Sequence, residues 1–463
     1  MLIGKEALYA KRTLNDFKKL SYVIQTGNGS FNEKALRKEI DHYEKFVNNP
    51  VLGKIIDWSN FPLQSNDLKF MLTQGKHLIG VADDLAGASG PRKYLVAFQN
   101  SAEARGTGGI IGGYALVEIK NGKFKVLRVG PNTDLVSMRK LPIKVSSEYY
   151  KIYGDDPAIW QNSNYSPDFP SGAKIWLALW KNQFGEELDG VIAIDPFVLE
   201  AILSTTAPLK MPDGVVLDSK NIVRFLLSDL YVKYETDNLA RKNYLVDIVR
   251  RTLDSITGPN VNQKELLKGL LKPAMDGRIL IYSKHIKEEA EIKKSDLGGS
   301  LTLNPNDISL VVMNTSGNKM DYYLKRTVSI ERRKCGKDSF ARINVKLENQ
   351  VPSNKDLPNY VKGRLDLNRP AGLNNSHGVT VFIYGPKNGS YLLSGSRTYS
   401  EMKIGIGEEL GRPLFVTNLE LKSKKPVDLF VDFTANAEPL STKVQSLVID
   451  QSTTILDDCK SGR

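Results

Sequence analysis

Five glycines and one arginine lie close together in the stretch NSAEARGTGGIIGGYALVEI, residues 100–119. Glycines let backbone N–H groups turn toward one point, and the planar guanidinium of Arg105 matches a pair of phosphate oxygens. The stretch therefore has the residue types that hold phosphate. The alternative is a glycine-rich bulge that lets two strands pack closely, and on spacing alone this structural interpretation is the stronger one.

The spacing of these glycines excludes the two common nucleotide-binding loops. A dinucleotide fingerprint, G-x-G-x-x-G, must open a helix after a strand. Gly106, Gly108, Gly109 and Gly112 miss that spacing and precede a predicted strand. A P-loop must end in Gly-Lys-Ser/Thr, which the stretch lacks. Phosphate binding here would depend on turned N–H groups and Arg105.

A second charged group lies in YETDNLARKN, residues 234–243. Phosphoryl transfer needs positive charge around the leaving phosphates and a carboxylate that takes the proton of the acceptor hydroxyl. In this hypothesis Arg105, Arg241 and Lys242 supply the charge, and Asp237 is the base. The alternative is that Asp237 and Arg241, at i and i+4, form a solvated surface salt bridge.

Three other polar motifs each have a structural and a functional interpretation. Asp168 in NYSPDFP, residues 164–170, either forms part of a turn or faces a pocket, and the turn is preferred. Asp195, which precedes Pro196, is predicted to cap a helix. In NTSGNKMD, residues 314–321, the lysine and aspartate either rim a cleft or fix a domain boundary, and the boundary is preferred.

Composition indicates a globular chain of more than one domain. Of the 463 residues, 41% are hydrophobic and 25% are charged, which suffices for packed cores. The net charge of +12 is spread along the chain with few interleaved aromatic residues. We therefore expect an anionic surface or a phosphorylated partner and no nucleic acid. The 4 histidines and 2 cysteines lack the spacing of a zinc site or a histidine-based triad.

The sequence contains no apolar run of the roughly 18–20 residues that cross a membrane. The opening MLIGKEALYAKRTL also lacks the apolar core of a signal peptide. It has the character of the end of a longer apolar segment. We expect membrane proximity through a missing or trimmed N-terminal anchor.

Hydrophobic periodicity predicts three consecutive regions. Residues 1–86 are a helical N-terminal segment, in which Ser30 and Glu33 form a capping box. Residues 87–300 are an α/β domain with a mixed sheet flanked by helices. Its predicted elements are a strand at 93–100, a hairpin at 114–129 that turns at Asn121-Gly122, a strand followed by a helix at 191–203, and a helical section at 219–256. Residues 301–463 carry short strands separated by turn residues and predict a β-sandwich.

Several of these blocks occur in the order that an uncharacterised actinobacterial envelope family shows. KYLVAFQNSAEARGTGGIIGGYALVEI, NYSPDFPSGAKI, DGVIAIDPFVLEAIL, NLARKNYLVDIVRRTLDSI and MNTSGNKMDYYLKR together resemble domain of unknown function 4012. The resemblance covers most of the chain from about residue 85 onward. The same blocks are distantly similar to the LytR-CpsA-Psr proteins, which move glycopolymers from a polyprenyl-pyrophosphate carrier onto peptidoglycan.

The second resemblance implies roles for particular residues. Arg105 and Thr107 take the places of the first Arg and the Thr in an Arg-Ser-Asp-Thr element, and Asp237 and Arg241 fall where a later acid and Arg lie. Asn100 stands where an acidic residue is expected. The implied substrate-binding residues are Arg105, Thr107, Asn100, Lys242 and Asp168, and the implied catalytic residues are Asp237 and Arg241.

A magnesium ion and a disulfide are the remaining expectations that follow from the resemblance. Magnesium sites usually contain one or two carboxylates, and Glu103 and Asp237 are the candidates for this role. The substituted acidic positions leave both the metal and catalysis open. A cell-envelope location favours a bridge between Cys335 and Cys459, although two free thiols fit the spacing almost as well.

We therefore expect a LytR-CpsA-Psr-like α/β fold with a helical N-terminal segment and a C-terminal all-β sandwich. The expected function is that of an extracytoplasmic cell-envelope protein that binds a polyprenyl-pyrophosphate-linked glycan and transfers it to the cell wall as a glycopolymer phosphotransferase. In this hypothesis Arg105 and Arg241 meet at an apolar channel and grip the two phosphates. The alternative is a non-catalytic cell-wall binding or scaffold protein with the same fold.

Overall fold

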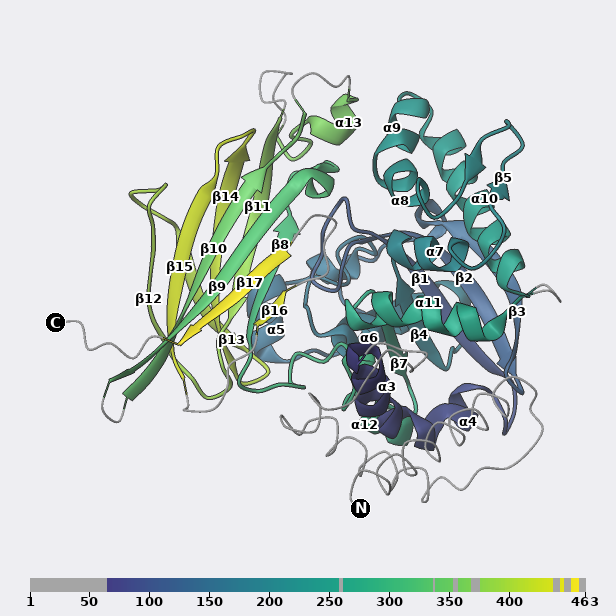
Figure 1. The fold of residues 1–463 in the computed structure, drawn as a ribbon, viewed down its shortest axis with the longest axis horizontal. Helices are drawn as coiled ribbons and strands as arrows, with labels where there is room; N and C mark the ends of the chain where they lie inside the picture. Colours follow the sequence, from purple (N-terminus) through teal and green to yellow (C-terminus); the bar gives the residue numbers. More distant parts are fainter. Residues whose placement is uncertain are drawn as a thin grey trace, which may run out of the picture.

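The computed structural model describes residues 65–257, 261–335, 338–352, 357–367, 375–435, 442–444 and 451–457. Two layered units lie side by side, an α/β unit followed by a β-sandwich (Figure 1). The α/β sheet runs from Arg92 to Ser283, and the first sandwich strand begins at Ile308. Most of the predicted helical segment, with its capping box, lies outside the described residues.

The α/β unit is built on a five-stranded mixed sheet. Its order is β3 (Lys123–Pro131), β2 (Ile110–Lys120), β1 (Arg92–Asn100), β4 (Gly190–Ile194) and β7 (Ile279–Ser283). Strand β1 is parallel to β4, and the other neighbours are antiparallel. The hairpin turn between β2 and β3 has positive φ at Asn121 (51°) and Gly122 (72°). The mixed sheet and this hairpin are as predicted.

Helices cover both faces of this sheet. The longer ones are α3 (Ser65–Leu78), α6 (Phe169–Phe184), α7 (Pro196–Leu203), α10 (Asn238–Thr257) and α11 (Gln263–Met275). The shorter helical elements are η3 (Ile79–Val81), α4 (Ala82–Leu85), η4 (Asn132–Asp134), α5 (Ser147–Tyr153), η5 (Asp156–Ala158), α8 (Ile222–Arg224), η6 (Phe225–Asp229), α9 (Leu230–Lys233), α12 (Ile286–Ile292) and η7 (Asp296–Gly298). A small hairpin of β5 (Leu209–Lys210) and β6 (Val216–Leu217) completes the unit.

The two faces of the sheet belong to different hydrophobic cores because side chains alternate along each strand. In β1, Leu95 and Ala97 join the core that contains the α6 residues Trp176 and Trp180. Tyr94, Val96 and Phe98 join the opposite core, formed with residues of α7, α10 and α11. No helix within the described residues combines the length and apolar character that crossing a membrane requires.

The predicted helical section at 219–256 is interrupted. It contains α8, a π-helical turn (η6), α9 and α10, with a break between Lys233 and Asn238. Tyr234 leaves the helical region with φ −121° and ψ 49°. The Asp237 side chain then accepts a hydrogen bond from the N–H of Ala240 at 2.8 Å. This side chain satisfies a free N–H group in the first turn of α10, so the second helix starts anew.

The C-terminal strands form two facing five-stranded sheets, as predicted. One has the order β12, β15, β10, β9, β17 and the other β13, β14, β11, β8, β16. Their bounds are β8 (Ile308–Asn314), β9 (Leu324–Cys335), β10 (Asp338–Asn349), β11 (Ser376–Tyr384), β12 (Tyr391–Ser396), β13 (Ile404–Glu409), β14 (Arg412–Lys422), β15 (Val427–Thr434), β16 (Thr442–Val444) and β17 (Gln451–Asp457). Two short helices, η8 (Met320–Tyr323) and α13 (Asn359–Lys362), precede β9 and β11.

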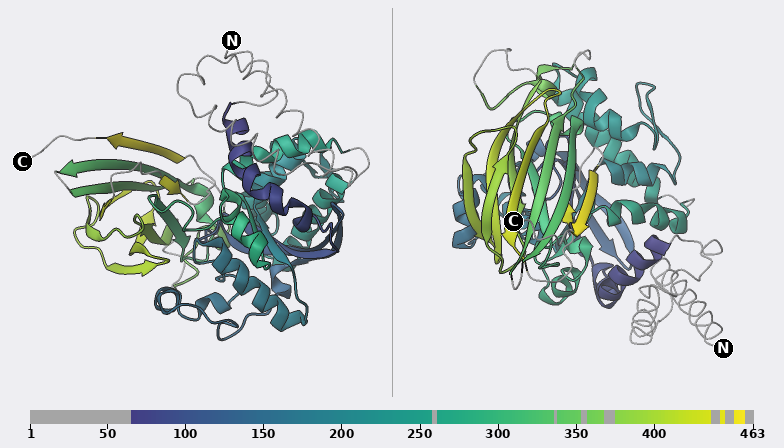
Figure 2. Two further views of the ribbon diagram at one scale, coloured as in Figure 1. Left: turned by 90° about the horizontal axis from the view of Figure 1, so that it is seen from below. Right: turned by 60° about the vertical axis from the view of Figure 1, so that its left-hand side comes forward.

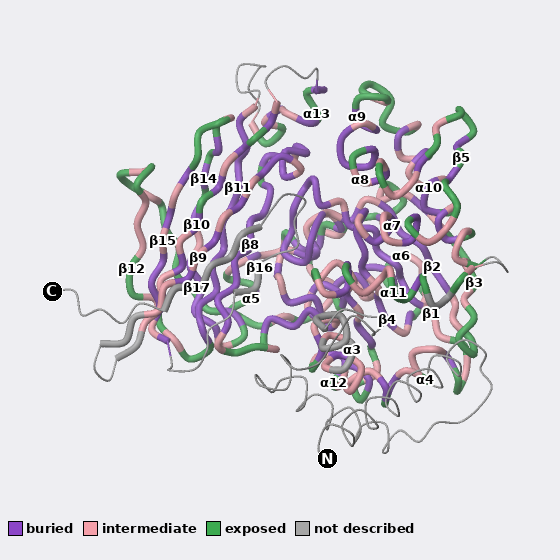
Figure 3. The backbone as a smooth tube through the Cα atoms, viewed as in Figure 1, coloured by how far each residue is buried: buried purple, intermediate pink, exposed green. Residues whose placement is uncertain are grey.

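The sheet that contains β8 and β11 is covered on both faces. Val381 and Ile383 face the sandwich core, whereas Phe382 and Tyr384 join the core of the α/β unit. Every residue of β8 and β11 is consequently buried (Figure 3). Figure 2 shows the sandwich against the α/β unit from two further sides. The two units therefore share one continuous apolar contact.

A buried carboxyl reinforces this contact. Glu409, at the end of β13, accepts hydrogen bonds from Ser166 (2.7 Å), Tyr384 (2.8 Å) and Tyr153 (3.1 Å). Burial raises the pKa of Glu409. Ser166 and Tyr153 belong to the α/β unit and Tyr384 to the sandwich, so one side chain satisfies polar groups from both units.

The glycine-rich loop between β1 and β2 is buried along residues 101–109. A Cβ atom at Gly106 would lie 2.1 Å from the Tyr165 carbonyl oxygen, and one at Gly109 would lie 2.2 Å from the Asn100 carbonyl oxygen. These glycines permit close approach of backbone segments. The geometry thus supports the packing interpretation of the stretch.

Replacing Gly106 by alanine is expected to destabilise the protein by about 3 kcal/mol, because the new methyl group overlaps backbone atoms that cannot move aside. Gly112→Ala is the matched control, since its Cβ would meet its nearest neighbour at 3.6 Å, an ordinary contact. Urea unfolding of both variants measures the difference. Equal stability of the two variants would contradict this account of the loop.

Stability should also depend on pH through Glu289 on α12. Burial raises the pKa of Glu289 to about 7, although the N–H of Ser283 donates to it at 3.0 Å. The folded protein therefore binds a proton more tightly than the unfolded chain, and stability falls as the pH rises from about 4.5 to about 7. Glu289→Gln should raise the melting temperature at pH 8 and leave it nearly unchanged at pH 5.

The control for this titration is Glu291→Gln on the same helix, where the carboxylate pairs with Lys294 at the surface. Thermal melts from pH 4.5 to pH 8 compare the two variants with the parent protein. A pH slope that persists in Glu289→Gln would mean that another group is responsible.

Candidate functional site

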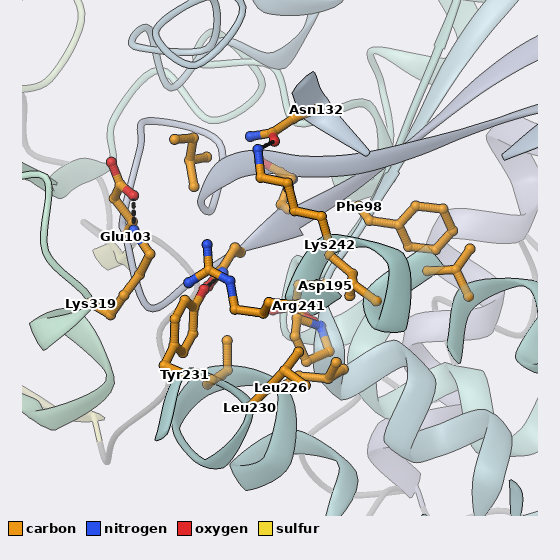
Figure 4. A pocket seen from close by; sticks show the side chains of 18 of the residues that line it. Phe98, Glu103, Asn132, Asp195, Leu226, Leu230, Tyr231, Arg241, Lys242 and Lys319 are labelled. Carbon is orange, nitrogen blue, oxygen red and sulfur yellow. Dashed lines mark hydrogen bonds and ion pairs between the residues drawn. The ribbon is translucent and has the colours of Figure 1, made fainter. Parts of the chain in front are cut away.

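A cleft opens between the α/β unit and the sandwich, beside the end of β1 (Figure 4). It encloses about 800 Å³, which includes space open to solvent. Strands β1 and β2 and helices α7, α9 and α10 supply most of its walls, and the sandwich contributes Lys319 and Tyr360.

One part of the cleft wall is apolar. Most of its side chains belong to the core that contains Tyr94, Val96 and Phe98, so they pack behind the cleft as well as lining it. They are Phe98, Ile110, Pro196, Leu199, Leu226, Leu227, Leu230, Leu245 and Val249. Such a surface favours a hydrocarbon group over water.

Arg241 is the central cation of the cleft, and only 9% of its surface is exposed. Its guanidinium carbon lies 4.4 Å from the centre of the Tyr231 ring and 4.7 Å from that of Tyr360. It also donates to the Asn238 side chain. Within the described part of the chain no carboxylate pairs with Arg241, so its charge is balanced only by aromatic and amide groups.

Lys242 is the second such cation. Its ammonium group donates to the Asn132 side chain at 2.8 Å, and burial lowers its pKa. Among the residues that the structure describes, it too has no carboxylate partner. Lys242 and Arg241 therefore face the cleft with uncompensated charge, which is costly unless a ligand neutralises it.

The third cation, Lys319, is fully paired. It forms a buried ion pair with one oxygen of Glu103, and the other Glu103 oxygen accepts from Arg105 at 3.0 Å. Burial lowers the pKa of Lys319, but the Glu103 carboxylate outweighs this effect and the net pKa is raised. Lys319 precedes β9 and Glu103 follows β1, so the pair joins the sandwich to the loop beside the cleft.

Arg105 does not line the cleft, contrary to expectation. Its guanidinium donates to the carbonyls of Gln161 (3.0 Å), Ala104 (3.0 Å) and Asn314 (3.2 Å), and to the side chains of Glu103 and Asn162. These bonds use all five N–H donors of the group. In this arrangement Arg105 has none left for phosphate, and its contact with Glu103 positions that carboxylate.

Two of the other expected binding residues, Asn100 and Lys242, line the cleft. The Asn100 side chain donates to the Tyr231 hydroxyl. Thr107 is buried within the glycine-rich loop, where it donates to Gln99 at 2.8 Å and accepts from Asn164 at 2.8 Å. Asp168 caps α6 by accepting from the N–H of Ser171 at 3.2 Å.

The expected catalytic pair is divided. Arg241 lies in the cleft, whereas Asp237 is exposed, does not line the cleft and caps α10. The cleft has two carboxylates of its own. Glu103 is held by Lys319 and Arg105, and Asp195 caps α7 and pairs with Arg278 at 2.6 Å. The predicted cap at Asp195 is confirmed.

Glu103 and Asp237 do not form a set of magnesium ligands. Both oxygens of Glu103 already accept hydrogen bonds from cations, and the Asp237 side chain caps helix α10. No group of at least three His, Cys, Asp or Glu side chains that could hold a metal occurs within the described residues. The predicted Cys335–Cys459 disulfide involves Cys459, which lies outside the described residues.

The sequence analysis did not identify two cleft residues, Tyr231 and Tyr360, and it considered a cleft role for a third, Lys319, only as the less favoured alternative. Lys319 belongs to the motif at residues 314–321, for which a domain boundary was preferred over the rim of a cleft. In the structure Lys319 lines the cleft and also joins the two units. Tyr231 and Tyr360 carry no local pattern that distinguishes them from core tyrosines. Their importance arises because segments distant in the chain place both rings against Arg241.

Replacing Glu103 by glutamine should destabilise the protein by about 3–5 kcal/mol, because it leaves buried Lys319 and Arg105 without a counter-ion. The control is Glu118→Gln, a half-buried carboxylate on β2, for which a change below about 0.5 kcal/mol is expected. Urea unfolding provides the measurement. Similar stability of the two variants would show that the Glu103 pairs contribute little.

Comparison with known proteins gives a match to one uncharacterised family. The model of a family described as "Protein of unknown function (DUF4012)" matches residues 89–231. This bears out the resemblance to domain of unknown function 4012 over that stretch. Arg241, Lys242, Lys319 and Tyr360 lie after it in the chain.

No curated protein matches the chain. Among solved structures, one that is similar is described as the transcriptional regulator yvhJ from Bacillus subtilis. It is 12% identical, and the comparison covers 45% of this chain and 77% of that one, with a TM-score of 0.24. A likeness this weak carries no argument. The match to domain of unknown function 4012 is thus what these comparisons establish.

Proposed function

We propose that the cleft binds a polyprenyl-pyrophosphate-linked glycan, with the diphosphate at Arg241 and Lys242 and the isoprenoid chain along the apolar wall. The observation that carries this proposal is a pair of cations, buried Arg241 and half-buried Lys242, without carboxylate partners among the described residues. A bound diphosphate would supply the missing negative charge. Charge-assisted hydrogen bonds to it are stronger than those to neutral groups.

The apolar wall supports a lipid ligand rather than free phosphate. Leucines from η6 and α9 meet Leu199 of α7 and Leu245 of α10 around the same cleft. Figure 4 shows Arg241 between Lys319 and Glu103 on one side and Phe98 on the other. A ligand with one charged and one hydrocarbon part matches both kinds of lining.

A second candidate function is binding without transfer, which the positions of the carboxylates support. A transfer reaction needs a base near the acceptor hydroxyl. The Glu103 and Asp195 carboxylates of the cleft are held in ion pairs, and Asp237 lies elsewhere as a helix cap. A non-catalytic cell-wall binding or scaffold protein would use the cleft as it stands. A phosphotransferase would need a base from the acceptor or a rearranged site.

An extracytoplasmic, membrane-proximal location in the cell envelope is part of the proposal. It follows from the ligand class, since a polyprenyl carrier stays in the bilayer and its glycan is used at the wall. An N-terminal anchor would keep the cleft near that supply.

Farnesyl diphosphate serves as a short probe of the cleft. We expect it to bind more tightly than farnesyl monophosphate and much more tightly than farnesol, because only the diphosphate neutralises both cations. Arg241→Gln should weaken binding of the diphosphate roughly tenfold to hundredfold, which corresponds to about 1.5–3 kcal/mol for hydrogen bonds to a charged group. Isothermal titration calorimetry measures these affinities.

The matched control is Arg224→Gln, since Arg224 is exposed on nearby α8 and pairs with Asp229. It should bind the probe like the parent protein. Equal affinity for farnesol and the diphosphate, or no effect of Arg241→Gln, would overturn the proposal. Native mass spectrometry of protein from its own membrane fraction should also show a co-purifying polyprenyl phosphate.

A further inference from the structure

We infer that the β-sandwich forms part of the ligand site, with Tyr360 as a positioning residue that holds Arg241 at the place where the ligand's phosphates bind. This inference rests on the proposed function and adds to it a second domain and a specificity-determining residue.

The Tyr360 ring contacts two cations that come from different units. Its centre is 4.7 Å from the Arg241 guanidinium carbon and 4.5 Å from the Lys319 ammonium nitrogen. Tyr360 is 39% exposed, whereas Lys319 is only 2% exposed. The π-face of the ring attracts both cations.

Tyr360 is held in place by hydrogen bonds within the sandwich. It belongs to α13, which packs on the segment that carries Lys319. The N–H of Lys319 donates to the Val361 carbonyl at 3.0 Å, the Asn318 side chain donates to the Gly363 carbonyl at 3.1 Å, and the N–H of Leu365 donates to the Ser316 carbonyl at 2.9 Å. These bonds hold Tyr360 and Lys319 as one group.

A small core anchors this group directly beneath the cleft. Tyr231 of α9 packs with Met320, Tyr323, Val351, Leu357 and Val361 of the sandwich. Ser228 of η6 and Tyr323 also share a hydrogen bond of 2.9 Å between their hydroxyls. Tyr231 and Tyr360 lie with ring centres 5.8 Å apart, and Arg241 contacts both. The position of Arg241 thus depends on contacts across the two units.

The electrostatics agree with this role. Burial would raise the pKa of Tyr360, but Lys319 and Arg241 outweigh it, and the pKa is lowered. The phenol oxygen thus lies in the positive field of the two cations, the field that would also draw an anionic headgroup.

Binding of farnesyl diphosphate and farnesyl monophosphate to two variants tests the inference. Tyr360→Ala should lower the affinity for the diphosphate about tenfold and reduce the preference for diphosphate over monophosphate, since Arg241 loses one of its two aromatic supports. Tyr360→Phe keeps the ring and should stay within about twofold of the parent protein. Leu365→Ala, an exposed side chain on the same segment, is the control and should change neither value.

Hydrogen exchange gives an independent measurement. In the parent protein, farnesyl diphosphate should slow amide exchange in residues 357–367, because the ligand would fix Arg241 against Tyr360. If the parent protein binds the diphosphate but Tyr360→Ala has unchanged affinities and amide exchange in residues 357–367 is also unchanged, the inference is overturned. The proposed function would then still stand. Failure of the parent protein to bind any prenyl phosphate would instead overturn both.

Discussion

The carboxylate of Glu103 is the interaction on which the arrangement of the cleft depends. It accepts from Lys319 of the sandwich and from Arg105 of its own loop, and all three side chains are nearly inaccessible to solvent. An unpaired buried charge is costly. The two units therefore cannot separate at this point without exposing or orphaning charges. The cleft walls keep their relative positions for the same reason.

The charged side chains in and beside the cleft form two sets, one paired and one without carboxylate partners. Lys319, Glu103, Arg105 and Asp195 are all paired and make a fixed frame. Arg241 and Lys242 project from α10 into that frame, and the carboxylates of the cleft are already committed to other cations. Charge that a protein leaves unpaired beside an apolar wall is a common mark of a ligand site. A protein that binds the ligand without transferring it would need only these two cations and the apolar wall.

Local patterns predicted much of the fold but only part of the site. The hairpin at Asn121-Gly122, the cap at Asp195 and the sandwich strands follow from turn residues, side-chain oxygens and alternation within short stretches. The break before α10 was missed because Asp237 was assigned a chemical role, whereas it caps the helix. Arg105 was assigned to phosphate since sequence does not reveal that carbonyls from residues 161 and 314 would occupy its donors. Tyr360 could not be found at all, because its role requires a contact between α13 and α10.

The glycine-rich loop has a consequence for how the chain is made. The N–H of Ala104 donates to Asp321 at 3.0 Å, and the Ala104 carbonyl accepts from Asn314 at 3.1 Å. During synthesis, the loop therefore leaves the ribosome more than two hundred residues before Asn314 and Asp321 do. Until then the loop's polar backbone must stay hydrated, and the growing α/β unit cannot complete its core around it. The cleft is thus a late product of synthesis, and a chain that terminates before the sandwich would lack it.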